Sequence, residues 1–335
     1  MNLFRITFRW VVSLAALVTA ATIAAAQAPA PGRLLVLLRD ASALAIVDPV
    51  SGTVLGKAPT ARDPHEVTAS ADGRLAFVAS PSDGISVIDV AARKEIRRVN
   101  PGPGSGPHDV VFADGKVYFT IEGYKSIGRY DPSTNAIDWT LGIGQDGTHL
   151  LAFNRDRSAV FMPNRGSNSV TMAEGVSAGP SKTKLTVIPV PGKLPEGIDL
   201  SPDGREVWTA TRNDGSVSII DVASRKVVQT IDLKMKDANR LKFTPDGRVL
   251  IIDGKAASLV VMDAASRREV KRVPLGPGET GDGAILVAPD GSRAYLGLRA
   301  KDRVAEFDLK TLEVTREFTM DAGSGPGCIY WIGAN

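Results

Sequence analysis

The chain has 335 residues, of which 43% are hydrophobic and 23% are charged, and its formal net charge is +3. This is ordinary globular composition, and the near-neutral charge argues against nucleic acid as a partner. The single cysteine, Cys328, excludes a disulfide framework within the chain, so packing has to supply the stability, and we expect Cys328 to be a small buried residue in a strand.

The first 26 residues have the pattern of a signal peptide. Arg5 and Arg9 form a positive segment, an apolar run follows, and three alanines at 24–26 make a small-residue cleavage site. The apolar run is short for a bilayer span, although an uncleaved membrane anchor is the alternative. We therefore expect residues 1–26 to be a cleaved Sec-type signal peptide. Residues 27–335 would then form one domain that is periplasmic or secreted, without stable membrane insertion.

Residues 33–59 contain three apolar strands, and from residue 64 a longer unit recurs along the chain. The unit is an apolar strand, a turn such as Ser-Pro-Asp-Gly, a second strand, a polar loop, a third strand ending in Asp, a turn and a fourth strand. Two copies read PHEVTASADGRLAFVASPSDGISVIDVAARKEIRRV and PEGIDLSPDGREVWTATRNDGSVSIIDVASRKVVQTI. The Asp-Gly pairs at 203–204, 246–247 and 290–291 supply the positive φ that tight hairpins need.

Each unit has one equivalent position, two residues before the apolar pair of its first strand, which we call the anchor. The anchors recur every 41 to 47 residues, and the longest gap holds a surface insertion at 173–184. The seven anchors are His65, His108, His149, Glu196, Asn239, Gly283 and Gly327. A four-stranded unit of about 40–45 residues is the size of a β-propeller blade.

The last unit, GPGCIYWIGAN, supplies one strand, and residues 33–59 supply three strands with no first strand before them. The sequence therefore predicts an all-β fold. It is a seven-bladed β-propeller with four-stranded antiparallel blades, closed where N-terminal strands and a C-terminal strand share one blade. A solenoid is the alternative, but it would need polar caps at its ends.

Two segments resemble known propeller families. NRGSNSV (164–170) and VWTATRNDGSVSIIDVASRKVVQTIDL (207–233) resemble the YVTN-type repeat of exported bacterial and archaeal proteins, with FMPN and VWTA in place of Tyr-Val-Thr-Asn. GPHDVVFADGKVYFTIEGYKSIGRYDP (106–132) is similar to a blade of the streptogramin-lyase propellers. The resemblance implies a seven-bladed propeller and leaves the function open, because such families include binding, surface-layer and enzymatic members.

In a propeller the anchors ring one mouth of the central channel, and the loops between second and third strands open on the same face. Those loops carry Asp83, Glu122, Arg165, Arg212, Asp253, Lys255 and Arg299. All three histidines of the chain are anchors on consecutive blades, and three imidazoles with an oxygen ligand suit zinc or copper. The candidate metal ligands are His65, His108, His149 and Glu196, and Asn239 and Arg212 join them as candidate ligand-binding residues. The alternative is a polar channel lining in which each histidine bonds water and its neighbours.

These residues fit functions of different classes. The first is a binding scaffold that holds a small molecule or a protein on this face. The second, implied by the resemblance to lyase and lactonase-type propellers, is a metal-assisted hydrolase or lyase. In it His108 or His149 would act as general base or ligand, and Glu122 or Glu196 as an acid or ligand. A third is an electron-transfer or copper-handling accessory protein of the cell envelope.

Overall fold

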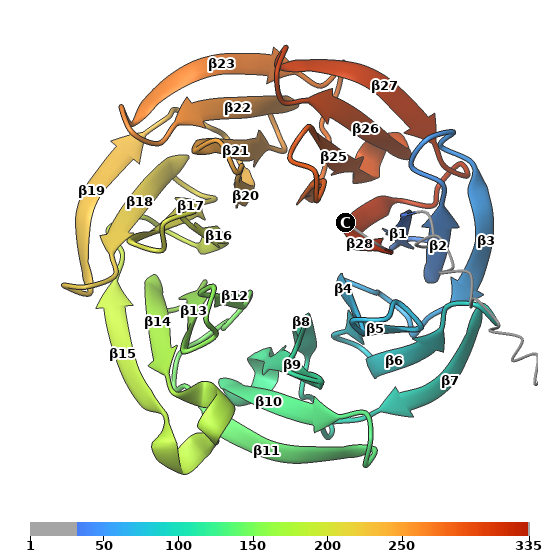
Figure 1. Ribbon diagram of the computed structural model, residues 1–335. Coiled ribbons are helices and arrows are strands. Elements are labelled where there is room, and N and C mark those ends of the chain that lie inside the picture. The colour runs from blue at the N-terminus through green and yellow to red at the C-terminus, as the bar shows by residue number, and fades with distance from the viewer. Residues whose placement is uncertain (1–31, 334–335) are drawn as a thin grey trace, which may run out of the picture.

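Seven four-stranded antiparallel sheets stand in a ring around a central axis in the computed structural model, which describes residues 32–333 (Figure 1). The expected all-β, seven-bladed propeller is confirmed. The expected signal peptide at 1–26 lies outside the described residues. Within 32–333, no helix is long and apolar enough to cross a membrane.

Blades are numbered from the one that contains β1, and in each of them the innermost strand faces the axis. The innermost strands of blades 1 to 7 are β28 (Pro326–Ile332), β4 (Glu66–Ala69), β8 (Pro107–Ala113), β12 (Ala152–Phe153), β16 (Pro195–Leu200), β20 (Ala238–Phe243) and β24 (Gly283–Val287). The second strands are β1 (Arg33–Leu38), β5 (Leu75–Ser80), β9 (Lys116–Ile121), β13 (Ala159–Asn164), β17 (Glu206–Thr211), β21 (Arg248–Asp253) and β25 (Arg293–Leu298).

The third and fourth strands complete each blade toward the rim (Figure 1). The third strands are β2 (Ala43–Val47), β6 (Gly84–Asp89), β10 (Ser126–Asp131), β14 (Ser169–Glu174), β18 (Ser216–Asp221), β22 (Ser258–Asp263) and β26 (Arg303–Asp308). The outer strands are β3 (Val54–Pro59), β7 (Lys94–Val99), β11 (Ala136–Gly142), β15 (Lys184–Pro189), β19 (Lys226–Asp232), β23 (Arg268–Pro274) and β27 (Glu313–Thr319).

Burial follows position within the blade. Second and third strands are buried almost throughout, because both of their faces pack against neighbouring blades, whereas the outer strands alternate between exposed and half-buried residues. Seven apolar clusters fill the spaces between adjacent blades. One of them packs Tyr295 and Phe318 of blade 7 against Leu34 and Val36 of blade 1, so the first and last blades join as tightly as the others.

The ring closes in blade 1 as the sequence predicts. β28 pairs antiparallel with β1, from Arg33 opposite Ile332 to Leu38 opposite Pro326, and this pairing covers the inner edge of the N-terminal strands. Cys328 lies in β28 but is half-buried rather than buried, because the innermost strand faces the axis.

The turns also agree with the sequence. Gly204, Gly247 and Gly291 all have positive φ, between 66° and 81°. The insertion at 173–184 forms two short 3-10 helices between β14 and β15, η2 (Val176–Ala178) and η3 (Pro180–Lys182). Two more follow second strands, η1 (Glu122–Tyr124) and η4 (Arg299–Lys301).

Candidate functional site

The anchors lie where the innermost strands begin, at one end of the axis. Four of them sit inside irregularities of the inner strand, where the register with the second strand shifts around His108, Glu196, Asn239 and Gly327. A bulge of this kind changes the direction of the side chain at the extra residue. The repeated bulge therefore turns His108, Glu196 and Asn239, the anchors of blades 3, 5 and 6, toward the same mouth.

A second ring of positions is formed by the first residue after each second strand, which we call the collar. Its members are Arg39, Pro81, Glu122, Arg165, Arg212, Gly254 and Arg299. The collar backbone is tied to the loop that precedes the inner strand of the same blade. The amide of Arg39 donates to Gly325 O at 2.9 Å, and that of Glu122 donates to Gly106 O at 3.2 Å.

The sequence GSGP forms the loop side of these bonds in blades 3 and 1, at 104–107 and again at 323–326. In both copies the serine carbonyl also accepts an amide from the next collar-loop residue, Gly123 or Asp40. The motif thus fixes the backbone of Glu122 in blade 3 and of Arg39 in blade 1.

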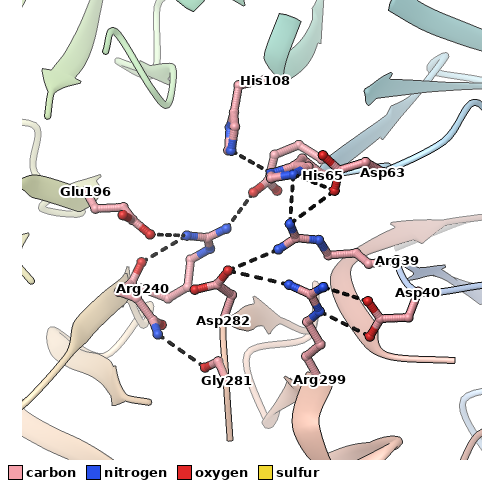
Figure 2. A network of polar contacts seen from close by, with 12 residues as sticks. Arg39, Asp40, Asp63, His65, His108, Glu196, Arg240, Gly281, Asp282 and Arg299 are labelled. Carbon is pink, nitrogen blue, oxygen red and sulfur yellow. Dashed lines mark hydrogen bonds and ion pairs between the residues drawn. The ribbon is translucent and has the colours of Figure 1, made fainter. Parts of the chain in front are cut away.

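The three histidines converge at the mouth rather than pointing toward separate blades. His65 Nδ1 lies 2.7 Å from His108 Nε2, as Figure 2 shows, and the rings of His108 and His149 lie 3.8 Å apart between centroids. His108 is 4% exposed and His149 is 1% exposed. A carboxylate joins them, because Glu122 Oε1 lies 2.7 Å from His149 Nδ1.

Two imidazole nitrogens in this cluster have no partner. His108 Nδ1 and His149 Nε2 are buried and make no hydrogen bond to any residue within 32–333. Both nitrogens of His65 are engaged, because Nε2 lies 3.0 Å from Asp63 Oδ1 and 2.7 Å from Arg39 Nη2. Orphaned buried polar atoms are costly, so these two nitrogens mark a place where a ligand would be stabilising.

One ligand atom each of His108, Glu122 and His149 lies within 4.8 Å of the other two, so the three form a compact triad. Burial holds the pKa of His108 well below its ordinary value, and His65 and Arg240 add to the effect. Burial does the same to the pKa of His149, reinforced by His108 and Arg165. Burial also raises the pKa of Glu122, against the opposing charge of Arg165. Both imidazoles are therefore neutral at pH 7 and keep a lone pair available.

Ion pairs connect the rest of the mouth into one cluster, which we call the mouth network. Its five arginines are Arg39, Arg165, Arg212, Arg240 and Arg299. Its seven carboxylates are Asp40, Asp63, Glu66, Glu122, Glu196, Asp237 and Asp282. With neutral histidines and ionised carboxyls the network carries two net negative charges, which would be balanced by a divalent cation.

Arg240 is the centre of the mouth network. From β20 its guanidinium reaches across the axis to Glu66 Oε1 of β4 at 2.7 Å. It also contacts Glu196 Oε1 of β16, in the neighbouring blade, at 3.2 Å (Figure 2). Beneath it, a cavity of about 320 Å³ is lined by all seven innermost strands. Asp109 lies in that cavity, where burial and Glu66 raise its pKa to about 7.

The other residues predicted for ligand binding lie at this mouth but are already engaged. Glu196 forms ion pairs with Arg165, Arg212 and Arg240. Asn239 is buried and donates through Nδ2 to Asp237 Oδ2 at 3.1 Å and to Gly281 O at 3.3 Å.

Sequence reasoning missed several members of the mouth network: Arg39, Asp40, Asp63, Glu66, Asp237, Arg240 and Asp282. Five of these seven lie within two residues of an anchor, as in DPHE (63–66) and DANR (237–240), and this was the available signal. Most of their partners come from other blades, and no local pattern identifies them.

Comparisons with known proteins support the fold. No protein-family model matches the chain. The chain is 20% identical over 292 residues to antigen Lp49 of Leptospira interrogans, covering 82% of this chain and 62% of that protein. It is 28% identical over 140 residues to the uncharacterized protein YncE of Salmonella typhi, covering 40% of this chain and 38% of that one. The chain thus spans less than two thirds of the length of these curated relatives.

Solved structures with the same architecture are more distant in sequence. A putative 6-phosphogluconolactonase from Bacteroides uniformis has a TM-score of 0.72 at 13% identity, over 90% of this chain and 99% of that one. Streptogramin B lyase has a TM-score of 0.67 at 13% identity, over 79% and 86%. AztD of Citrobacter koseri has a TM-score of 0.66 at 14% identity, over 91% and 98%. At these identities the likeness concerns the fold alone.

Proposed function

We propose that the protein is an exported, ligand-binding propeller whose ligand at the mouth is a divalent transition metal ion, zinc or copper. The ion would be held by His108, His149 and Glu122. The observation that carries the proposal is the triad itself, two buried neutral imidazoles and a carboxylate with ligand atoms within 4.8 Å of one another. Nitrogen and carboxylate ligands of this kind are those that zinc and copper take in proteins.

The ion would take the place of the proton held between His149 Nδ1 and Glu122 Oε1. Those atoms are 2.7 Å apart, whereas two ligands of a tetrahedral zinc ion are about 3.3 Å apart at bonds of about 2.0 Å. A small widening therefore makes room for the metal. The proton of His149 would move to Nε2, where Glu196 Oε1, at 3.8 Å, is ready to accept it.

His65 would support the metal rather than bind it. Arg39 can only donate, so its 2.7 Å contact with His65 Nε2 and the 3.0 Å contact of the same nitrogen with Asp63 belong to different tautomers of His65. When Nε2–H donates to Asp63, His65 Nδ1 accepts from His108 Nε2–H, and the lone pair of His108 is on Nδ1, the buried nitrogen without a partner. Asp63 thus favours the tautomer of His108 that can bind a metal ion, and Arg39 opposes it.

Metal content and affinity test the proposal. The purified protein should bind about one Zn²⁺ or Cu²⁺ per chain, measured by mass spectrometry and by competition with a chromophoric chelator. Glu122→Gln and a His108→Gln, His149→Gln double variant should lose this site, while Glu313→Gln, an exposed carboxylate on the outer strand β27, should keep it. Equal binding by all four proteins would contradict the assignment.

Export is part of the same proposal, supported by the positive, apolar and small-residue segments of 1–26. The protein expressed with its full N-terminus should be recovered from the periplasm or the medium with Gln27 as its first residue. Recovery of the intact chain from the cytoplasm would contradict this.

A metal-assisted hydrolase or lyase is the second candidate. Three protein ligands leave a coordination position for water, as in catalytic zinc sites, and this observation favours the reading. The metal-loaded protein would then hydrolyse lactones or esters, and Glu122→Gln would abolish turnover. A loaded protein that turns over none of these substrates would support the binding role.

A further inference from the structure

Arg165 differs from the other arginines of the mouth network in how its side chain is used. It is the collar residue of blade 4, and its amide is fixed by a 2.9 Å bond to Gly147 O. Its side chain is 31% exposed and makes one ion pair, from Nε to Glu196 Oε2 at 3.2 Å. Within the described chain, 32–333, no hydrogen bond is made by its two terminal nitrogens.

The terminal nitrogens of the other four arginines all contact a partner within 32–333. Arg212 bonds Asp237, Glu196 and Asp282, and Arg240 bonds Glu66 and Glu196. Arg39 bonds His65 and Asp282. Arg299 bonds Asp40 through two of its nitrogens, as Figure 2 shows. Arg165 is therefore the one arginine of the described network whose two terminal nitrogens remain free to bind an anion.

Arg165 also lies beside the triad. Its charge acts on His108, His149 and Glu122 alike, opposing protonation of the two imidazoles and favouring the carboxylate form of Glu122. Arg165 is connected to the triad through Glu196, whose Oε2 lies 3.2 Å from Arg165 Nε and whose Oε1 lies 3.8 Å from His149 Nε2. The planar pair of N–H groups of a guanidinium matches the two oxygens of a carboxylate.

We propose that Arg165 and the metal ion together bind a small monocarboxylate, one oxygen on the metal and the carboxylate group facing the guanidinium. This inference rests on the proposed metal site. The charge of the site selects the ligand class. The mouth network carries two net negative charges and a divalent ion neutralises it, so a singly charged anion is favoured over a doubly charged phosphate.

Cobalt provides a probe that separates the two proposals. The full mature protein is loaded with Co²⁺, and its visible absorption is followed while acetate or inorganic phosphate is added. We expect acetate to change the spectrum saturably and at lower concentration than phosphate. In Arg165→Met the acetate midpoint should rise about tenfold or more. Arg165→Lys should lose less acetate affinity than Arg165→Met, because lysine keeps the positive charge but lacks the planar pair of N–H donors.

Arg62→Met is the matched control, because Arg62 lies on the same face and pairs only with Asp83. It should leave the acetate midpoint unchanged. Co²⁺ affinity in Arg165→Met should be equal or tighter, because a positive charge near the cation has been removed.

Each outcome decides a different point. If the protein does not bind Co²⁺ at all, the proposed function fails and this inference fails with it. If Co²⁺ binds but acetate has no effect, or if Arg165→Met keeps the normal midpoint, the inference alone fails. Tighter binding of phosphate than of acetate would overturn the monocarboxylate assignment.

Discussion

Replacing Arg240 by Met tests whether the buried ion pairs hold the mouth together. The side chains of Arg240, Glu66 and Glu196 are 14%, 10% and 3% exposed, so all three charges are largely withdrawn from water. Glu196 keeps Arg165 and Arg212 as partners after the substitution. Glu66 loses its one ion-pair partner within 32–333 and becomes an uncompensated buried carboxylate.

Removing one partner of a buried pair costs about 3–5 kcal/mol, and we take the lower value because Glu196 stays paired. For a domain of this size that corresponds to a fall in Tm of about 5–10 °C in calorimetry. A Glu66→Gln, Arg240→Met double variant removes the orphaned charge as well, and we expect it to recover at least half of the loss. Arg62→Met, which breaks an exposed pair on the same face, should leave Tm unchanged.

The same substitution should affect metal binding in the opposite direction. The positive charge of Arg240 opposes protonation of His108 and His149, and it would oppose a metal ion in the same way. Arg240→Met should therefore bind Zn²⁺ several-fold more tightly while being less stable. A single variant as stable as the parent, or a double variant as unstable as the single one, would refute the reasoning.

Two further predictions concern the histidines. Asp63→Ala should weaken Zn²⁺ binding about 10- to 100-fold without loss of the folded state, because it removes the acceptor that favours the Nε2–H tautomer of His65. An unchanged dissociation constant in chelator competition would contradict this. In the metal-free protein, the free energy of unfolding should fall as pH drops below about 6.5, the ordinary pKa of histidine. The reason is that His108 and His149 bind protons in the unfolded chain but stay neutral while they are buried in the folded one. Asp109, with its pKa raised to about 7, binds a proton in the folded state and partly offsets this. We therefore expect the slope in urea melts to be small near pH 6.5 and to rise toward about 1.4 kcal/mol per pH unit near pH 5; a flat profile would contradict the buried neutral imidazoles.

The fold could be predicted because every blade repeats the same pattern of strands and turns in the sequence. Asp-Gly turns such as 203–204 need a positive φ, and a single strand at 326–332 can only pair with the three strands near the N-terminus. Once the period is known, equivalent positions must share one end of the ring. The convergence of three anchor histidines therefore follows from topology, although their 2.7 Å and 3.8 Å contacts do not.

The ion-paired half of the mouth could not be predicted, because its contacts join long side chains of blades that are far apart in the sequence. Arg240 reaches Glu66 over 174 residues of sequence, and Arg39 reaches Asp282 over 243. No spacing rule relates such pairs. The bulges that aim the anchors were also invisible, since a strand with a bulge and one without it have the same apolar pattern.

The two glycine anchors have a physical reason that links both halves of the mouth. A Cβ at Gly327 would lie 2.8 Å from Arg39 Cδ, so a side chain there would push away the arginine that contacts His65. A Cβ at Gly283 would lie 2.7 Å from Ile252 Cδ1 in the neighbouring blade. Gly327 thus leaves space for a collar arginine, and Gly283 leaves space for an apolar side chain of the next blade. The histidines lie near the collar carboxylate Glu122, and this asymmetry brings two neutral imidazoles and a carboxylate together on one side of the ring.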